Sequence, residues 1–489
     1  MPWTKENLRE VVKDKLGEHK FIVVSNREPY IHSYSEGGMQ CITPASGMTV
    51  ALDPVMRACG GTWVAHGSGD ADREVVDEKD RVQVPPGKPS YTLRRVWLTK
   101  EEEQRFYYGY SNEGLWPLCH NVYVRPTFRE SDWEVYKKVN EKFADVVLEE
   151  LGDETGFVFI QDYHFALLPK LIKERRPDAV VGQFWHIPWP NPEAFRVCPQ
   201  AEDLLWGLLG NDILGFHTRY HCLNFLDSVD RFLEVRVDRE RLSVFKSGRE
   251  TLVRPFPISI DFEMIESLAR SPEIEKRKSA LKIDFRIKNR RLGVGIDRVD
   301  YTKGILERFN AIDRFFEKYP EYIGKFVFLQ LGPLSRIHIP KYQEYNDDIY
   351  HRMVDINEKY KSKNWQPIIL HKTHLSLEEI LAYDMAADLF VVSSVHDGMN
   401  LVAKEFVASR VDEKGVLLLS KFTGSARELE HALLINPIAT DQFADAIKVA
   451  LEMPLDEQSE RMKKMREIVK ENNVYRWAVK IISEMKKLI

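Results

Sequence analysis

Cysteine is scarce in this chain of 489 residues, and its distribution excludes two structural devices. The five cysteines are odd in number and widely spread, and no two of them form a CxxC pair. Such a pattern fits neither a disulfide framework nor a structural zinc site. We therefore expect reduced, mostly buried thiols at Cys41, Cys59, Cys119, Cys198 and Cys222.

Long apolar runs are missing as well. No stretch approaches the roughly 18 apolar residues that are needed to cross a bilayer. The first twenty residues are charged throughout and lack the apolar core and cleavage site of a secretory signal. The sequence thus predicts a soluble, cytoplasmic protein that does not use a membrane.

Charge of one sign is not concentrated anywhere in the chain. The formal net charge of -5 is small for this length, and no run of lysine and arginine is long enough to form a nucleic-acid footprint. Nucleic acid is therefore excluded as the expected partner.

Signature motifs of several enzyme classes are also absent. There is no GxxxxGK[ST] stretch and no GxSxG, and "GVGI" at 293–296 is not a GxGxxG fingerprint. ATPases and nicotinamide-dependent enzymes lose support, and we expect no cofactor. The acidic "DADRE" at 70–74 has no histidine partners, so we predict no metal site there or elsewhere.

Length and apolar content predict two domains. With 44% hydrophobic residues the chain can bury more than one core, and single cores stop growing at roughly 250 to 300 residues. We place the boundary in "LVRPFPISID" (252–261), where two prolines flank Phe256. The predicted domains are 1–255 and 256–489, and the last helix could cross back to the first domain.

Short apolar runs rich in branched residues alternate with longer amphipathic segments, a pattern typical of βαβ units. A stripe of four apolar residues from Ile305 to Phe316, with i, i+4, i+7 and i+11 spacing, predicts a helix over a sheet face. We expect an α/β fold of two Rossmann-like, doubly wound domains that face each other across a cleft. The predicted strands are 21–25, 157–161, 180–185, 212–216, 291–296, 326–331, 367–370, 388–394 and 415–420.

Polar side chains follow these predicted strands, where open α/β sheets bind their ligands. Several cations and acids are therefore expected to converge on one cleft. Cations suit a diphosphate, and carboxylates suit sugar hydroxyls, so the pattern favours a polyhydroxylated, anionic ligand. The residues in question are Arg27, Asp162, His164, His186, Arg298, Lys303, Arg336 and, in "VHDGMNLVAKEF" (395–406), Asp397 and Glu405.

Each of these side chains also has a structural alternative. Arg298 and Lys303 could be exposed strand-end cations, and Asp397 could be the N-cap of the helix that follows "DGMN". On a helix, the spacing of Asp397 and Glu405 would put both carboxylates on nearly one face. Some alternatives concern further residues: His186 could be a core histidine, His164 and His217 are expected to be structural, and Arg336 could pair with Glu28 or Asp300.

The motifs resemble those of the trehalose-6-phosphate synthase family, which are retaining glycosyltransferases with the two-domain GT-B fold. The resemblance extends from Phe21 to about Met453. It is carried by "SNREPY", "GLWPLCH", "QDYH", "HIPWPNPE", "GFHTRYH", "DRVDYTKG" and "DGMNLVAKE".

The resemblance implies a nucleotide-sugar donor, most simply UDP-glucose, and a sugar-phosphate acceptor. On the donor side it implies that Arg298 and Lys303 hold the diphosphate, Glu405 the ribose and Asp397 the glucose hydroxyls. Further roles follow from it: Gly47, Asn400 and Leu401 line the donor; Arg27, Tyr107 and Arg336 hold the acceptor phosphate; Trp116 and Asp162 complete that pocket; His186 lies at the reacting centre.

The expected reaction is glucose transfer to glucose 6-phosphate, which gives trehalose 6-phosphate. Three positions depart from the commonest family pattern: the Ser46-Gly47-Met48 loop, His66 and His217. "REPY" and "GFH" are similar to the glucosylglycerol-phosphate synthases. An acceptor such as glycerol 3-phosphate therefore stays an alternative, as does a non-catalytic sugar-phosphate sensor. A homo-oligomer is compatible with the sequence.

Overall fold

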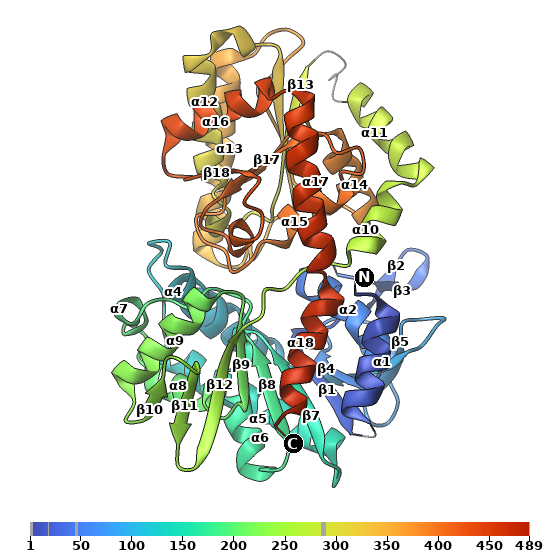
Figure 1. Ribbon diagram of the computed structural model, residues 1–489, viewed down its shortest axis with the longest axis vertical. Helices are drawn as coiled ribbons and strands as arrows, with labels where there is room; N and C mark the ends of the chain where they lie inside the picture. The colour runs from blue at the N-terminus through green and yellow to red at the C-terminus, as the bar shows by residue number, and fades with distance from the viewer. Residues whose placement is uncertain (1–2, 18, 45–46, 285–289, 489) are drawn as a thin grey trace. The chain divides into compact units, whose positions relative to one another are not determined.

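The computed structural model describes residues 3–17, 19–44, 47–284 and 290–488, and its elements form two units (Figure 1). The first unit comprises Met1–Ile258 and Val474–Ile489, and the second comprises Ser259–Asn473. Both units consist of a largely parallel sheet with helices packed on it, so the predicted α/β class is confirmed.

The first unit is built around a ten-stranded sheet in the order β10-β11-β12-β9-β8-β7-β1-β4-β6-β5. Its inner strands run parallel, whereas the edge strands β5 and β10, and β11 next to β10, are antiparallel to their neighbours. The strands are β1 (Lys20–Arg27), β2 (Ile31–Ser35), β3 (Gly38–Ile42), β4 (Thr62–His66), β5 (Arg81–Val84), β6 (Tyr91–Val96), β7 (Gly156–Gln161), β8 (Val180–Phe184), β9 (Ile213–Phe216), β10 (Arg236–Asp238), β11 (Ser243–Lys246) and β12 (Arg249–Pro255).

Helices on both faces cover this sheet, and β2 pairs with β3 in a separate hairpin. The helices of the first unit are α1 (Lys5–Leu16), α2 (Gly47–Cys59), η1 (Asp72–Glu74), α3 (Lys100–Glu102), the π-helix η2 (Glu103–Leu115), α4 (Trp116–His120), α5 (Glu130–Leu151), η3 (Tyr163–Phe165), α6 (Leu168–Arg175), α7 (Pro192–Phe195), α8 (Ala201–Leu208), α9 (Arg219–Phe232) and α18 (Val474–Lys486).

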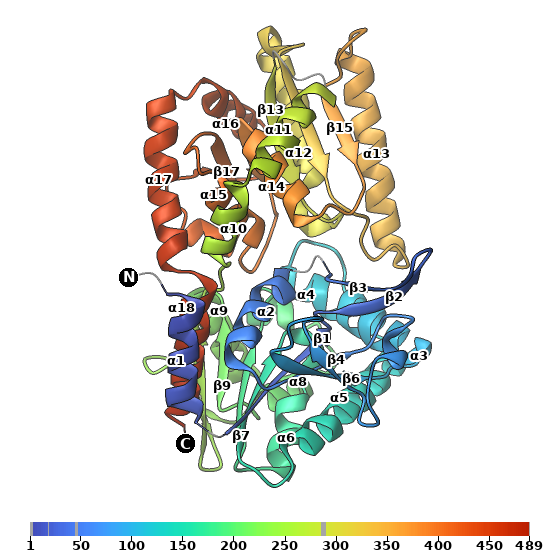
Figure 2. The ribbon, with the colours of Figure 1, turned by 90° about the vertical axis from the view of Figure 1, so that its right-hand side faces the viewer.

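The helix α18 belongs to the first unit although the whole second unit precedes it in sequence. It packs beside α1, as Figure 2 shows. Its Trp477 donates a hydrogen bond from Nε1 to the Phe256 carbonyl at 3.2 Å. The Trp477 ring is nearly perpendicular to that of Phe184, with ring centroids 5.2 Å apart. The last helix therefore completes the apolar packing of the first sheet.

The second unit has a six-stranded parallel sheet in the order β15-β14-β13-β16-β17-β18. This is the 3-2-1-4-5-6 order of doubly wound dinucleotide-binding sheets, whose order reverses between β13 and β16. The strands are β13 (Arg291–Ile296), β14 (Phe326–Leu331), β15 (Ile368–His371), β16 (Leu389–Val392), β17 (Val416–Ser420) and β18 (Leu433–Ile435).

The helices of the second unit cover both faces of its sheet, and the predicted stripe from Ile305 to Phe316 is fully buried on α12. They are α10 (Phe262–Ala269), α11 (Pro272–Asp284), η4 (Tyr301–Lys303), α12 (Ile305–Lys318), η5 (Pro320–Tyr322), α13 (Pro340–Tyr360), α14 (Leu377–Ala386), α15 (Leu401–Ser409), η6 (Gly424–Arg427), α16 (Thr440–Glu452) and α17 (Leu455–Glu471).

All nine strands that the sequence predicts are present as β1, β7, β8, β9 and β13 to β17, with ends that differ by at most a few residues. The cysteines carry free thiols, and Cys119, Cys198 and Cys222 are buried as expected. Cys41 is exposed instead, because every residue of β3 faces solvent. Among the described residues, no helix combines the length and the apolar character that a membrane span requires.

Candidate active site

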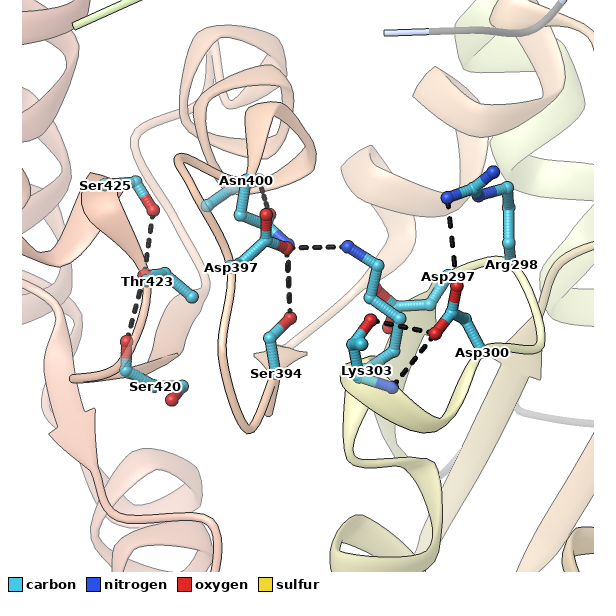
Figure 3. Close-up of polar contacts among 12 residues, drawn as sticks. Asp297, Arg298, Asp300, Lys303, Ser394, Asp397, Asn400, Ser420, Thr423 and Ser425 are labelled. Atoms are coloured by element: carbon cyan, nitrogen blue, oxygen red, sulfur yellow. Dashed lines mark hydrogen bonds and ion pairs between the residues drawn. The ribbon is translucent and has the colours of Figure 1, made fainter. Parts of the chain in front are cut away.

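In the second unit, polar side chains gather where β13 and β16 end, at the point where the strand order reverses (Figure 3). Lys303 comes from η4, directly after β13, and Asp397 comes from the loop after β16. The Lys303 Nζ lies 2.6 Å from the Asp397 Oδ2, and both side chains are mostly buried. The structure thus brings together two residues to which the family resemblance gives diphosphate and glucose roles.

The Asp397 carboxylate is held in one orientation by further donors. Its Oδ2 accepts hydrogen bonds from the Asn400 Nδ2 at 3.1 Å and the Ser394 Oγ at 3.3 Å (Figure 3). The backbone of the loop is fixed as well, because the Asp397 amide donates to the Phe422 carbonyl at 3.2 Å. A carboxylate with several fixed donors cannot reorient, so the oxygen atoms stay where the loop places them.

The cap of α15 is Asn400, not Asp397. The Asn400 Oδ1 accepts a hydrogen bond from the Ala403 amide at 3.0 Å, and the residue has a left-handed φ of +75°. The helix starts at Leu401, so Asp397 lies outside it. The N-cap alternative for Asp397 is therefore wrong, and Asp397 and Glu405 do not share one face of a helix.

Glu405 lies within α15 and is partly exposed. Burial among its neighbours raises the pKa of its carboxyl to about 7. A carboxyl of this kind changes its charge near neutral pH.

Arg298 and Arg336 both lie near a buried acid, Asp300. The Asp300 Oδ2 is 4.0 Å from the Arg298 Nη2 and 3.5 Å from the Arg336 Nη1. Burial opposes the ionisation of Asp300, but Arg336, Arg298, the Thr302 amide and Lys303 together lower the pKa of its carboxyl. The pairing of Arg336 with Asp300, expected as an alternative, is present. Glu28 pairs instead with Arg95 of the first unit, at 2.9 Å.

Arg336 is held in an uncommon backbone conformation, with φ at +51°. Its side chain is 5% exposed, and its Nη1 donates to the Tyr342 Oη at 2.5 Å. Left-handed backbone at a residue other than glycine costs free energy and persists only where the surrounding structure enforces it. Arg298, with 36% of its side chain exposed, is the more accessible cation of the two.

In the first unit, Arg27 and Tyr107 meet at the end of β1. The exposed Arg27 donates from Nη2 to the Tyr107 Oη at 2.9 Å. Tyr107 comes from the π-helix η2, and its ring stacks on His164 with centroids 5.6 Å apart and planes 14° apart. The stacking agrees with the structural role expected for His164 and fixes the phenol beside the guanidinium.

Asp162, His186 and Trp116 lie near the ends of β7 and β8. Asp162 has a left-handed φ of +71°, and its Oδ1 accepts a hydrogen bond from the His186 amide at 3.2 Å. Trp116, the first residue of α4, is buried with its ring centroid 5.9 Å from that of Tyr163. The first unit thus presents one acid and one histidine side by side.

His186 is neutral in this site. Its Nε2 lies 2.9 Å from the Gln161 Oε1, which only accepts, so Nε2 carries the proton and Nδ1 is the acceptor. Burial lowers the pKa of His186 to about 3. His217 donates from Nε2 to the His186 carbonyl at 2.8 Å, which agrees with the structural role expected for His217.

The positions that depart from the family pattern lie in the first unit. His66 is the last residue of β4 and pairs with Arg27 in the strand register, so it stands next to that cation. Its Nδ1 donates to the Val96 carbonyl at 3.2 Å, and burial lowers the pKa of its ring. Gly47 is exposed at the start of α2. Ser46 lies outside the described residues.

Sequence reasoning missed several polar residues that hold the site together. Asn112 and Ser394 are buried, and they donate hydrogen bonds to Tyr107 and Asp397 respectively. The buried Arg308 bonds to Asp297, which precedes Arg298 in the chain. Ser394 could have been found, because it is the last residue of the predicted apolar strand 388–394. Within the described part of the chain, no three His, Cys, Asp or Glu side chains form a metal-binding group. Asp72 of "DADRE" instead pairs with Arg95 at 2.7 Å.

Comparison with known proteins defines the class first. The fold matches solved GT-B structures: one, from E. coli and bound with UDP-2-fluoro glucose, has a TM-score of 0.85 and 31% identity over 96% of this chain and 99% of that one. A second, from Burkholderia xenovorans in complex with glucose-6-phosphate, has a TM-score of 0.85 and 29% identity over 95% and 100%. The fold is therefore GT-B, that of a glycosyltransferase.

Residues 19–487 match glycosyltransferase family 20, and the chain belongs to this family. The trehalose-6-phosphate synthase of Mycobacterium marinum is 34% identical over 98% of this chain and 96% of its own length. A bifunctional trehalose-6-phosphate synthase/phosphatase from Thermoproteus tenax is 35% identical over 95% of this chain. The chain spans only 63% of that bifunctional relative.

Proposed function

We propose that this protein transfers glucose from a nucleotide-activated glucose to glucose 6-phosphate, with retention of the anomeric configuration. UDP-glucose is the proposed donor and trehalose 6-phosphate the proposed product. The observation that carries the proposal is the meeting of Lys303 and Asp397 at adjacent strand ends of a doubly wound sheet. A cation for a diphosphate and a carboxylate for sugar hydroxyls lie side by side there.

The proposed donor residues lie at the strand ends of the second unit. Lys303 and Arg298 bind the diphosphate, and the amides around Asn400 and Leu401 lie at the start of α15, where a helix attracts anions. Asp397 binds hydroxyls of the transferred glucose, and Glu405 binds the ribose. The UDP-2-fluoro glucose of the E. coli relative supports this choice of donor.

The proposed acceptor residues are those around Arg27. Arg27 and Tyr107 bind the phosphate of glucose 6-phosphate, because guanidinium and phenol groups both donate hydrogen bonds to phosphate oxygens. Trp116 and Asp162 bind the sugar. The glucose-6-phosphate of the Burkholderia relative supports this choice of acceptor.

In the proposed reaction, the anomeric hydroxyl oxygen of the acceptor forms the new bond to C1 of the donor glucose. The bond between C1 and the phosphate oxygen breaks, and the diphosphate leaves with the electron pair. The acceptor's proton passes to that leaving oxygen on the same face of the sugar. Lys303 and Arg298 stabilise the charge that develops on the diphosphate, and the neutral His186 hydrogen-bonds the reacting sugar through Nδ1.

A substrate panel tests the proposal. UDP-, ADP- and GDP-glucose are each combined with glucose 6-phosphate, glucose or glycerol 3-phosphate, and release of the nucleoside diphosphate is measured. NMR of the product reports its anomeric configuration. We expect turnover with UDP-glucose and glucose 6-phosphate, an α,α-linked product and little use of unphosphorylated glucose.

Two outcomes would change the conclusion. Strong turnover with glycerol 3-phosphate and none with glucose 6-phosphate would keep the chemistry and replace the product, with His66 beside Arg27 as the place to look for the cause. No turnover with any pair would favour a sugar-phosphate sensor.

A cytoplasmic location belongs to the proposal, because free, widely spread cysteines fit a reducing compartment.

A further inference from the structure

Arg308 of α12 is an arginine with only 1% of its surface exposed. Its guanidinium donates hydrogen bonds to three side chains, the Asp297 Oδ2 at 2.7 Å, the Gln330 Oε1 at 2.5 Å and the Ser393 Oγ at 3.0 Å. These partners lie at the ends of β13, β14 and β16, which are neighbours in the sheet. One buried group therefore ties three strand ends together.

Two of the three ends that Arg308 holds, those of β13 and β16, lead to proposed donor residues. Asp297 precedes Arg298 in the chain. Ser393 donates from Oγ to the Gly304 carbonyl at 2.8 Å, next to Lys303, and it precedes Ser394, which bonds to Asp397. Arg298 and Lys303 are thus each adjacent in the chain to a residue bonded within this network, and Asp397 is linked to it through Ser394.

The backbone is shaped to leave room for the guanidinium. A Cβ atom at Gly295 of β13 would lie 2.1 Å from the Arg308 Nη1, so any side chain there would displace the guanidinium from its present position. Gly304 has a φ of +63°, and a Cβ atom at that position would lie 2.1 Å from the Ser393 carbonyl oxygen. Both glycines let the chain approach the Arg308 network closely.

We infer that Arg308 is a positioning residue for the diphosphate-binding cations, an inference that rests on the proposed function. Burial of a guanidinium costs free energy, which its ion pair with Asp297 and two further bonds offset. Lysine cannot replace it, because an ammonium group is a compact charge without the planar fork that reaches three partners. Loss of the fork lets the three strand ends shift, and Lys303 and Asp397 with them.

The experiment compares Arg308→Lys, Ser393→Ala and the double variant with the wild-type protein. UDP binding is measured by calorimetry, steady-state kinetics give KM for UDP-glucose and glucose 6-phosphate, and thermal melting reports stability. Arg410→Lys is the matched control. Arg410 is also a buried arginine of the second unit, but its Nη1 bonds the Asp384 and Ala387 carbonyls, which precede β16 at the opposite edge of the sheet.

We expect Arg308→Lys to weaken UDP binding about tenfold, the scale of a lost charge-assisted bond, and to raise the donor KM with the acceptor KM unchanged. Ser393→Ala should cause a smaller loss in the same direction. The double variant should lose less than the product of the two single effects, because both changes break one network. Arg410→Lys should lower the melting temperature and leave UDP binding unchanged.

The inference and the proposed function can fail separately. A wild-type protein that does not bind UDP contradicts the proposed function. A wild-type protein that binds UDP, with Arg308→Lys equally tight, overturns the positioning role. Equal losses of UDP binding in Arg308→Lys and Arg410→Lys, in step with melting temperature, would also overturn it, because Arg308 would then act on stability alone.

Discussion

Lys303 and Asp397 are 94 residues apart in the chain and form an ion pair of 2.6 Å. The pair joins the loops that follow β13 and β16, which are adjacent strands of the second sheet. A diphosphate that binds Lys303 would compete with Asp397 for the same ammonium group. Sugar hydroxyls that bind Asp397 would offset the loss, so under the proposed function the pair would couple recognition of the two parts of a nucleotide sugar.

We expect a large loss of turnover when the Lys303 ammonium group is removed. We predict that Lys303→Ala lowers kcat about 100- to 1,000-fold, since donors aimed at developing charge are typically worth that much. Lys341→Ala is the matched control, because Lys341 is an exposed lysine of α13 that pairs only with Glu344 among the described residues. Initial-rate kinetics decide the matter. Turnover of Lys303→Ala within about twofold of wild type would remove Lys303 from the mechanism.

Donor affinity should depend on pH near neutrality through Glu405. Burial raises the pKa of this carboxyl to about 7, so it is a carboxylate above that pH and is protonated below it. A carboxylate accepts hydrogen bonds from two ribose hydroxyls, and protonation removes part of that capacity. We predict that the KM for UDP-glucose rises as pH falls from about 8 to about 6. In Glu405→Gln the KM should be higher and flat, and a wild-type profile in that variant would contradict the assignment.

Stability of the first unit should fall as pH rises, because of Glu28. Burial chiefly raises the pKa of Glu28 to about 8 from 4.5; a hydrogen bond with Asp72 adds to this, and Arg95 opposes it. The folded state thus keeps a proton that the unfolded state releases between these two pKa values. The free energy of unfolding therefore decreases with pH across that window.

Glu28→Gln tests this directly. Glutamine stays neutral, so the variant should lose part of the decline in stability between about pH 5 and about pH 8. Thermal melting across that range provides the measurement. Glu149→Gln, which changes an exposed acid of α5 paired with Arg94, should keep the wild-type slope. An identical slope in Glu28→Gln would show that Glu28 is ionised throughout.

Asn112 should act on the acceptor side. This buried amide donates from Nδ2 to the Tyr107 carbonyl at 2.7 Å and accepts from the Tyr163 Oη at 2.8 Å, so it ties the Tyr107 segment to the residue after Asp162. We predict that Asn112→Ala raises the KM for glucose 6-phosphate and leaves UDP binding unchanged. It should also destabilise the protein by about 1 to 3 kcal/mol.

Asn357→Ala is the control for that prediction. Asn357 is a buried amide of α13 that makes two comparable bonds with Ile368 of the second unit. It should cost similar stability and leave both KM values unchanged. An Asn112→Ala enzyme with normal acceptor kinetics would confine Asn112 to a structural role.

Apolar patterning predicted the inner strands because parallel strands are buried on both faces and read as continuous apolar runs. For that reason, the strand predicted at 291–296 has the same bounds as β13 in the structure. Edge strands such as β5 and β10 are polar and short, so their apolar patterns cannot be distinguished from those of loop sequences. The π-helix η2 was not predicted either. It packs against α5 and η3, and the amino-acid composition of the segment does not reveal such contacts with other elements.

Part of the candidate site could be read from the sequence because strand ends are the ligand-binding edge of such sheets. Asn400 was missed as the cap because Asp397 is an equally good capping residue. The position of Arg308 in the sequence does indicate a buried role, which the sequence prediction did not include. It lies three residues after Ile305 and four before Ile312, on the apolar stripe of α12, where a charged side chain must be buried with partners.

The return of α18 to the first unit sets the order in which the two units can finish folding on a ribosome. The 215 residues Ser259–Asn473 must be made before α18 exists, which takes about 10 to 40 s at typical rates of synthesis. Until then the surface that receives Trp477, including Phe184, stays uncovered. Synthesis of the second unit is complete before that of the first. During this time the nascent first unit has an exposed apolar face, to which chaperones can bind and through which it can misassemble.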